Sequence, residues 1–126
     1  MLNLKATNPA TAAEAGYEIK VVLPDGTQTE AKIKVRGDAS AAVRNFFRKA
    51  HQQAQMKEMV AKRKGKEPEP MNIEELEEFA NQSAAVRIIS WSGMSEDGKT
   101  ELPYSKENAE RLMAEYPYLR DLVIGE

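Results

Sequence analysis

Two segments near the N-terminus alternate apolar and polar residues, the pattern of half-buried β-strands. Residues 17–23 place an apolar side chain at every second position, and residues 28–36 alternate three apolar residues with basic ones. Between them, residues 23–26 read Leu-Pro-Asp-Gly, with proline second and glycine fourth as in a type I turn. The pattern predicts a β-hairpin, and a lone hairpin needs another element to cover its apolar face.

Residues 39–64 contain neither proline nor glycine and are rich in helix formers. Asp38 and Ser40 are both candidates to cap the N-terminus of this helix. Apolar residues recur at three- and four-residue spacing, at Val43, Phe46, Phe47, Ala50, Ala54 and Ala61. The stripe thins beyond Ala54. We therefore expect a helix roughly 40 Å long that packs on the hairpin, while its C-terminal half projects or meets a partner.

Prolines at positions 68 and 70 interrupt the helical pattern, so we expect a hinge at residues 65–71. Asn72 then caps a second helix over residues 73–85, whose inward residues are expected to be Ile73, Leu76, Phe79 or Ala80, and Ala84. Residues 86–91 either continue this helix or form a third strand, since a short apolar run fits both. Ser105 is placed to cap a helix through Tyr116, and Pro117 to open a last short one.

These elements predict an α+β fold in which an N-terminal β-hairpin packs with a long helix and a helical C-terminal half follows. Residues 1–16 are rich in Ala, Thr and Asn and are expected to form a flexible arm, with a helical turn at residues 9–15. Residues 17–126 are then expected to form a single domain, because the chain length of 126 residues suits one hydrophobic core.

The amino-acid composition limits the cellular environments in which we expect to find the protein. The chain has no cysteine, which excludes disulfides, thiolate metal sites and cysteine nucleophiles. No apolar run approaches the roughly 20 residues of a membrane helix, and residues 1–15 do not resemble a signal peptide. We therefore expect a protein without a membrane partner, in the cytoplasm of the cell that makes it.

Charge is segregated along the chain although the net charge is only −2. Residues 39–66 carry eight basic residues and one glutamate, and residues 67–82 carry six glutamates and no base. The charges that we expect at a contact between helices or between subunits are Arg44, Arg48, Lys57, Lys62, Arg63, Glu74, Glu75, Glu77 and Glu78.

Three explanations of this segregation remain open. The two helices form an antiparallel pair with paired or solvated charges, or the acidic helix of one copy meets the basic helix of another, or the basic helix over residues 39–66 binds nucleic acid. The sequence argues against nucleic acid, because the basic residues circle the helix and few aromatic residues are present to stack on bases.

Catalytic and metal-binding patterns are missing from the sequence. His51 is the only histidine and has no acidic residue three or four positions away. Residues 95–98 are acidic but lack the alternating ligands of a calcium loop, and we interpret them as a turn. No glycine-rich phosphate loop or nucleophile motif is present. We expect a non-enzymatic protein without a cofactor.

Apolar residues on the long helix are the candidates for a partner-binding surface. Met56, Met59 and Val60 lie away from the stripe that includes Phe46 and Phe47. Methionine is an adaptable contact for apolar partners. The alternative is that the methionines pack against the second helix. Phe46 and Phe47 are included as candidates, although they are also the most natural core residues.

Several short motifs follow one another in an order that resembles tail assembly chaperones of long-tailed bacteriophages. They are Trp91-Ser92-Gly93, Asp97-Gly98, Leu102-Pro103-Tyr104-Ser105, Glu107-Asn108-Ala109 and Tyr116-Pro117, preceded by the strand-to-helix segment Val35 to Ser40. Tyr104 stands where phenylalanine is commoner. The resemblance covers roughly residues 17–125.

The resemblance implies a binding function in the host bacterial cytoplasm. Such chaperones bind the long helical tape measure protein, keep it in solution and help tail tube protein subunits assemble around it, often as oligomers. Two other functions stay open: a structural or adaptor component of the virion, and a nucleic-acid-binding regulator that uses the basic helix.

Overall fold

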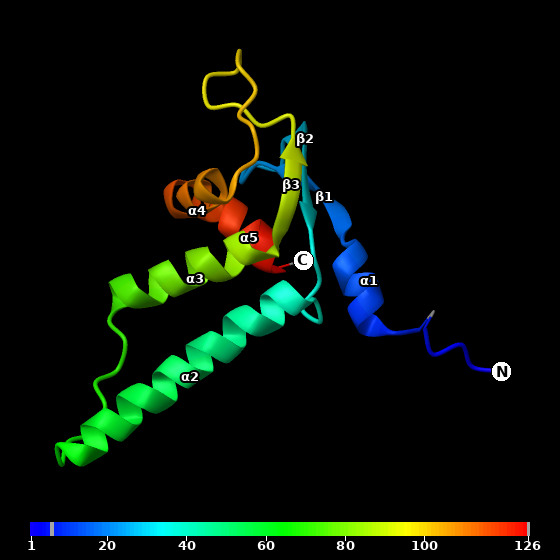
Figure 1. Ribbon diagram of the computed structural model, residues 1–126. Coiled ribbons are helices and arrows are strands. Elements are labelled where there is room, and N and C mark those ends of the chain that lie inside the picture. The colour runs from blue at the N-terminus through cyan, green and yellow to red at the C-terminus, as the bar shows by residue number, and fades with distance from the viewer. Residues whose placement is uncertain (6, 126) are drawn as a thin grey trace.

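The computed structural model describes residues 1–5 and 7–125, and its fold is α+β, as predicted. In chain order the elements are α1 (Pro9–Ala15), β1 (Tyr17–Val22), β2 (Gln28–Val35), α2 (Ala41–Arg63), α3 (Ile73–Arg87), β3 (Ile88–Ser92), α4 (Lys106–Glu115) and α5 (Pro117–Gly125) (Figure 1).

The predicted hairpin is confirmed. Strands β1 and β2 pair antiparallel, with Ile19 opposite Ile33. At the turn the backbone N–H of Gly26 donates to the carbonyl of Leu23 at 2.9 Å, and Gly26 has a φ of 89°. A residue with positive φ after a type I turn is a common way to close a hairpin, and glycine adopts it without steric cost.

Residues 86–91 are divided between the two predicted alternatives. Helix α3 continues to Arg87, and the chain turns extended at Ile88, whose φ is −81° and ψ 126°. Strand β3 then pairs antiparallel with β2, which gives the sheet order β1-β2-β3. The β-branched pair Ile88 and Ile89 favours this change, because branched side chains fit a pleated strand better than a helix.

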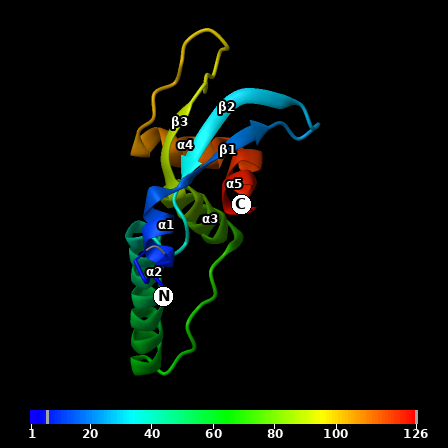
Figure 2. The ribbon, with the colours of Figure 1, turned by 90° about the vertical axis from the view of Figure 1, so that its right-hand side faces the viewer.

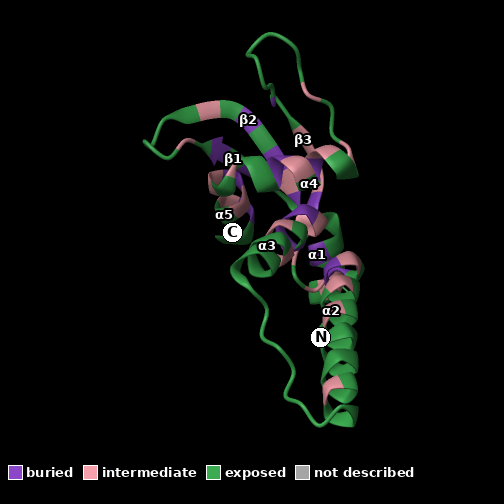
Figure 3. Cartoon of the chain, turned by 90° about the vertical axis from the view of Figure 1, so that its left-hand side faces the viewer, coloured by how far each residue is buried: buried purple, intermediate pink, exposed green. Residues whose placement is uncertain are grey.

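The hydrophobic core lies between one face of this sheet and the C-terminal helices. The strands contribute Ile19, Val21, Ala31, Ile33, Val35 and Ile88, and the helices contribute Ala84, Ala109, Leu112, Met113, Leu119 and Val123. Buried residues gather around the sheet, α4 and α5, whereas most of α2 is exposed (Figure 3).

The element that covers the sheet differs from our expectation. We expected the long helix to pack on the hairpin, but α4, α5 and the end of α3 do so, and α2 packs on α3. The physical reason is side-chain size. Helices α4 and α5 offer large apolar side chains such as Leu112 and Leu119, whereas beyond Val43 and its two phenylalanines the stripe of α2 offers only alanines. A larger apolar area makes burial more favourable.

The helical turn expected at residues 9–15 is confirmed as α1. The carbonyl of Ala13 accepts a hydrogen bond from the N–H of Gly37 at 3.0 Å, and Oε1 of Glu14 accepts one from the N–H of Ala41 at 2.6 Å. Helix α1 therefore docks beside the start of α2. The flexibility of residues 1–16 as an arm, and the single domain over residues 17–126, stay predictions.

Three of the predicted helix starts have the cap that the sequence indicates. The side chains of Ser40, Asn72 and Ser105 accept hydrogen bonds from the N–H groups of Val43, Glu75 and Asn108 respectively. Ser40 is the cap of α2, while the other candidate, Asp38, forms an ion pair with Arg87 at 3.2 Å. Capping satisfies backbone donors that a helix leaves unpaired and stabilises it by about 1 kcal/mol.

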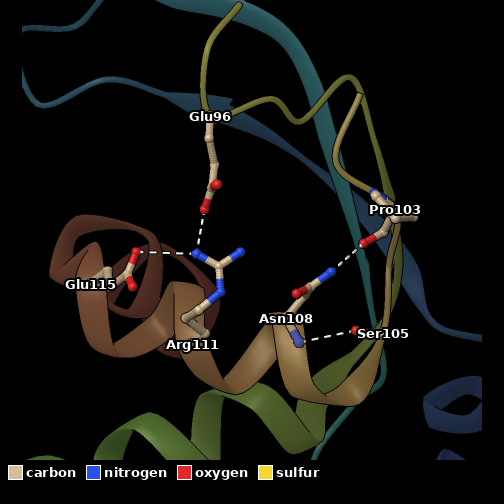
Figure 4. A network of polar contacts seen from close by, with 6 residues as sticks. All are labelled: Glu96, Pro103, Ser105, Asn108, Arg111 and Glu115. Carbon is tan, nitrogen blue, oxygen red and sulfur yellow. Dashed lines mark hydrogen bonds and ion pairs between the residues drawn. The ribbon is translucent and has the colours of Figure 1, made fainter. Parts of the chain in front are cut away.

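The connection between β3 and α4 is held by local polar contacts. Asp97 accepts hydrogen bonds from the N–H groups of Thr100 and Lys99, and these lower its pKa. Arg111 contacts Glu96 and also lies 3.3 Å from Glu115, so it ties this loop to α4 (Figure 4). The turn expected at residues 95–98 is thus confirmed.

None of the helices in the described part of the chain has both the length and the apolar character to cross a membrane.

The position of the core predicts that alanine substitutions at two methionines change the free energy of unfolding by different amounts. Met113 is fully buried, whereas Met56 is 63% exposed. Replacing Met113 by alanine should lower the free energy of unfolding by about 2–5 kcal/mol, because a buried side chain leaves a cavity. The same change at Met56 should alter it by less than about 0.5 kcal/mol. Urea unfolding measures both, and equal losses would contradict this assignment of the core.

Candidate partner-binding surface

Helices α2 and α3 and the connection between them form a helical lobe, defined here as residues 41–79, that extends away from the core. Figure 1 shows α2 and α3 running roughly antiparallel, with α2 on the side away from the sheet. Figure 2 shows α2 reaching below the rest of the fold before the chain returns to α3. From Arg44 to Glu78 the chain of this lobe contains no buried residue. The lobe is therefore outside the main core.

Three phenylalanines join the two helices at the base of the lobe. The ring centroids of Phe46 and Phe79 are 5.4 Å apart, those of Phe47 and Phe79 6.1 Å, and those of Phe46 and Phe47 5.3 Å. The guanidinium of Arg87 lies 5.6 Å from the Phe47 ring centroid, within cation–π range. Phe47 is nevertheless 40% exposed. The two predicted candidates Phe46 and Phe47 thus form a small cluster at the surface, outside the main core.

A groove of about 570 Å³ opens beyond this cluster, between α2, α3 and the proline-containing connection. Its apolar lining is Ala50, Ala54, Pro68, Pro70, Met71 and Phe79, and its polar lining is Gln53, Lys57, Glu58, Glu69 and Glu75. The volume lies in the range of protein ligand pockets, about 300–1,000 Å³. Small alanines on α2 allow close approach of another backbone, and the charged residues provide a rim.

Met56, Met59 and Val60 lie on α2 but do not line the groove. Their exposed fractions are 63%, 52% and 43%. The alternative that the two methionines pack against the second helix is therefore wrong. These side chains are available to another molecule, as expected of a partner-binding surface, but the structure separates them from Phe46 and Phe47.

Two residues that we expected to face inward are exposed. Ile73 is 74% exposed and Leu76 is 52% exposed, whereas Ala84 on the same stripe is fully buried. Helix α3 extends beyond the sheet, α4 and α5, so only its C-terminal half reaches the core. Helical periodicity shows which residues of α3 share a face, but it does not show which parts of the protein that face contacts. Met71, 42% exposed, was missed for a similar reason, because it lies in the connection, outside both helical stripes.

The segregated charges are solvated. All nine predicted residues are exposed. Among the described residues no ion pair joins α2 to α3, and Lys62 pairs at 3.3 Å with Glu58 of its own helix. Glu75 accepts a hydrogen bond from the Asn72 side chain, and Glu78 from Gln82. Charge pairing between the two helices of one copy is therefore not seen.

Residues 1–5 and 7–125 contain no group of three or more His, Asp or Glu residues placed to hold a metal ion.

The helical lobe, the sheet and the C-terminal helices define an α+β protein that presents a two-helix surface beside its core. The family model described as YdaY prophage protein matches residues 37–126, so the chain belongs to the YdaY prophage protein family. It is a phage-derived protein. The match includes the lobe and both C-terminal helices and leaves the hairpin outside. No curated protein and no solved structure matches the chain.

The aromatic cluster predicts how α2 is held. Replacing Phe79 by alanine should accelerate trypsin cleavage after Arg44, Arg48 and Lys49 several-fold, because α2 loses its contact with α3 and opens locally more often. Met71→Ala is the control, since Met71 is a partly exposed apolar side chain of the lobe that lies outside the cluster. Equal acceleration by both changes would mean that the cluster does not hold α2.

Proposed function

We propose that this protein is a phage tail assembly chaperone, a non-enzymatic protein that binds apolar helical segments of the tape measure protein and keeps them in solution. The observation that carries the proposal is the groove of about 570 Å³ on a lobe outside the main core. The family supports a phage origin, and the motifs from Trp91 to Pro117 support the finer function by resemblance.

The groove suits a helix better than a small polar ligand. Its apolar lining comes from two helices and a connection that contains Pro68 and Pro70, and its rim carries both signs of charge. A helix that lays an apolar face into such a groove removes that face from water, while its flanking charges meet Lys57 on one side and Glu69 or Glu75 on the other. Partner helices that expose apolar stripes are thus kept from aggregating.

The proposed function also implies an order of binding and release during tail assembly. The tape measure protein would be bound in the host cytoplasm, where tail particles form, and handed to tail tube protein subunits as they polymerise around it. The chaperone would then leave. A structural or adaptor component would instead be found in purified particles, so the composition of the particles separates these two functions.

A single charge in the groove should abolish chaperone function. Ala54 lines the groove, and Ala54→Glu puts a carboxylate among apolar groups that the partner must cover, where it loses its hydration, a cost that pairing with the nearby Lys57 does not necessarily repay. When the variant is co-expressed with the tape measure protein of the same prophage, the soluble fraction of that protein should fall at least several-fold below the wild-type level.

Gln55→Glu is the matched control, because it adds the same charge at the neighbouring exposed position, which does not line the groove. It should leave the soluble fraction unchanged. If the tape measure protein is equally soluble with wild type, with either variant and without this protein, the proposed function is wrong.

A further inference from the structure

Two exposed apolar faces of the helical lobe remain outside the groove. The first, the α2 face, consists of Met56, Met59 and Val60. The second, the α3 face, consists of Ile73 and Leu76. All five side chains are more than 40% exposed, and none lines the groove.

The charges around the two faces are opposite in sign. On a helix with 3.6 residues per turn, Lys49 and Arg63 fall on the same side of α2 as Met56. Glu77 falls beside Ile73 on α3, and Glu74 lies next to it along the chain. The α2 face is therefore an apolar patch with a basic rim, and the α3 face is an apolar patch with an acidic rim. The acidic α3 face of one copy thus complements the basic α2 face of another.

The two faces do not cover each other within one copy, since all five side chains remain exposed. Met56 and Met59 are each about a third of a turn or more around α2 from the groove residue Ala54, and Ile73 is about a third of a turn around α3 from Phe79. Each face is thus turned away from these groove residues on its own helix, and its side chains remain exposed. One copy therefore does not pair its own two faces.

We propose that copies of this chain associate head to tail, with the α3 face of each copy packed on the α2 face of the next. A contact between two different faces repeats until it closes into a ring or continues as an open chain. None of the five face residues lines the groove between α2 and α3, so this contact leaves the groove open in every copy. This inference does not depend on the proposed function, because it concerns the protein alone.

Two double variants test the head-to-tail contact. Met56→Gln with Met59→Gln removes the apolar centre of the α2 face, and Ile73→Gln with Leu76→Gln removes that of the α3 face. Glutamine is a good helix former, and the replaced side chains are exposed, so the fold should be kept. Circular dichroism checks the helix content of both variants.

Light scattering coupled to size-exclusion chromatography gives the mass of each sample. We expect wild type to form assemblies larger than a dimer and each double variant alone to have the mass of a monomer. An equal mixture of the two variants should double that mass and stop there, because it contains one intact α2 face and one intact α3 face.

Three results would overturn the inference: a monomeric wild type, a wild type that stops at a dimer, or a mixture that stays monomeric. Each is measured on this protein without the tape measure protein. If this protein does not associate head to tail, the groove and the proposed function are not affected. If the co-expression test alone fails, the head-to-tail contact is not affected.

Discussion

Burial of one sheet face beneath α4 and α5 is the interaction on which the rest of the structure depends. A three-stranded sheet has one apolar face to cover, and Leu112, Met113, Leu119 and Val123 cover it with the end of α3. Once this face is buried, α2 has no place in the core. It is held instead at its base by the phenylalanine cluster and the buried side chain of Val43, and most of its length lies in solvent. The apolar residues of the lobe are thus exposed because other helices already cover the apolar face of the sheet.

The local elements were largely predictable from the sequence, because their signals are local. Alternating residues and a Pro-Asp-Gly turn gave the hairpin, and Ser40, Asn72 and Ser105 marked three helix starts correctly. The arrangement of the helices was not predictable in the same way. Helical periodicity shows which residues share a face, but the residue that meets that face is distant in sequence. For that reason the long helix was placed on the sheet, and Ile73 and Leu76 were placed inside.

The candidate site, like the fold, could be predicted from the sequence only in part. The position of Met56 and Met59 off the stripe left open whether they pack on the second helix or face a partner, and only the structure shows that they are exposed. The groove was not expected, since it needs the connection with Pro68 and Pro70 to lie near Ala50 and Ala54. Segregated charge was visible in the sequence, but only the structure shows that the two helices of one copy do not pair their charges.

The central claim is that the helical lobe, and not the sheet, is the surface that binds another protein. Amide hydrogen exchange measured by mass spectrometry on this protein, alone and in complex with co-purified tape measure protein, tests it most directly. We expect slower exchange within residues 50–79 in the complex and unchanged exchange in β1, β2, β3, α4 and α5. Slower exchange over the sheet and the C-terminal helices, with no change in the lobe, would contradict it.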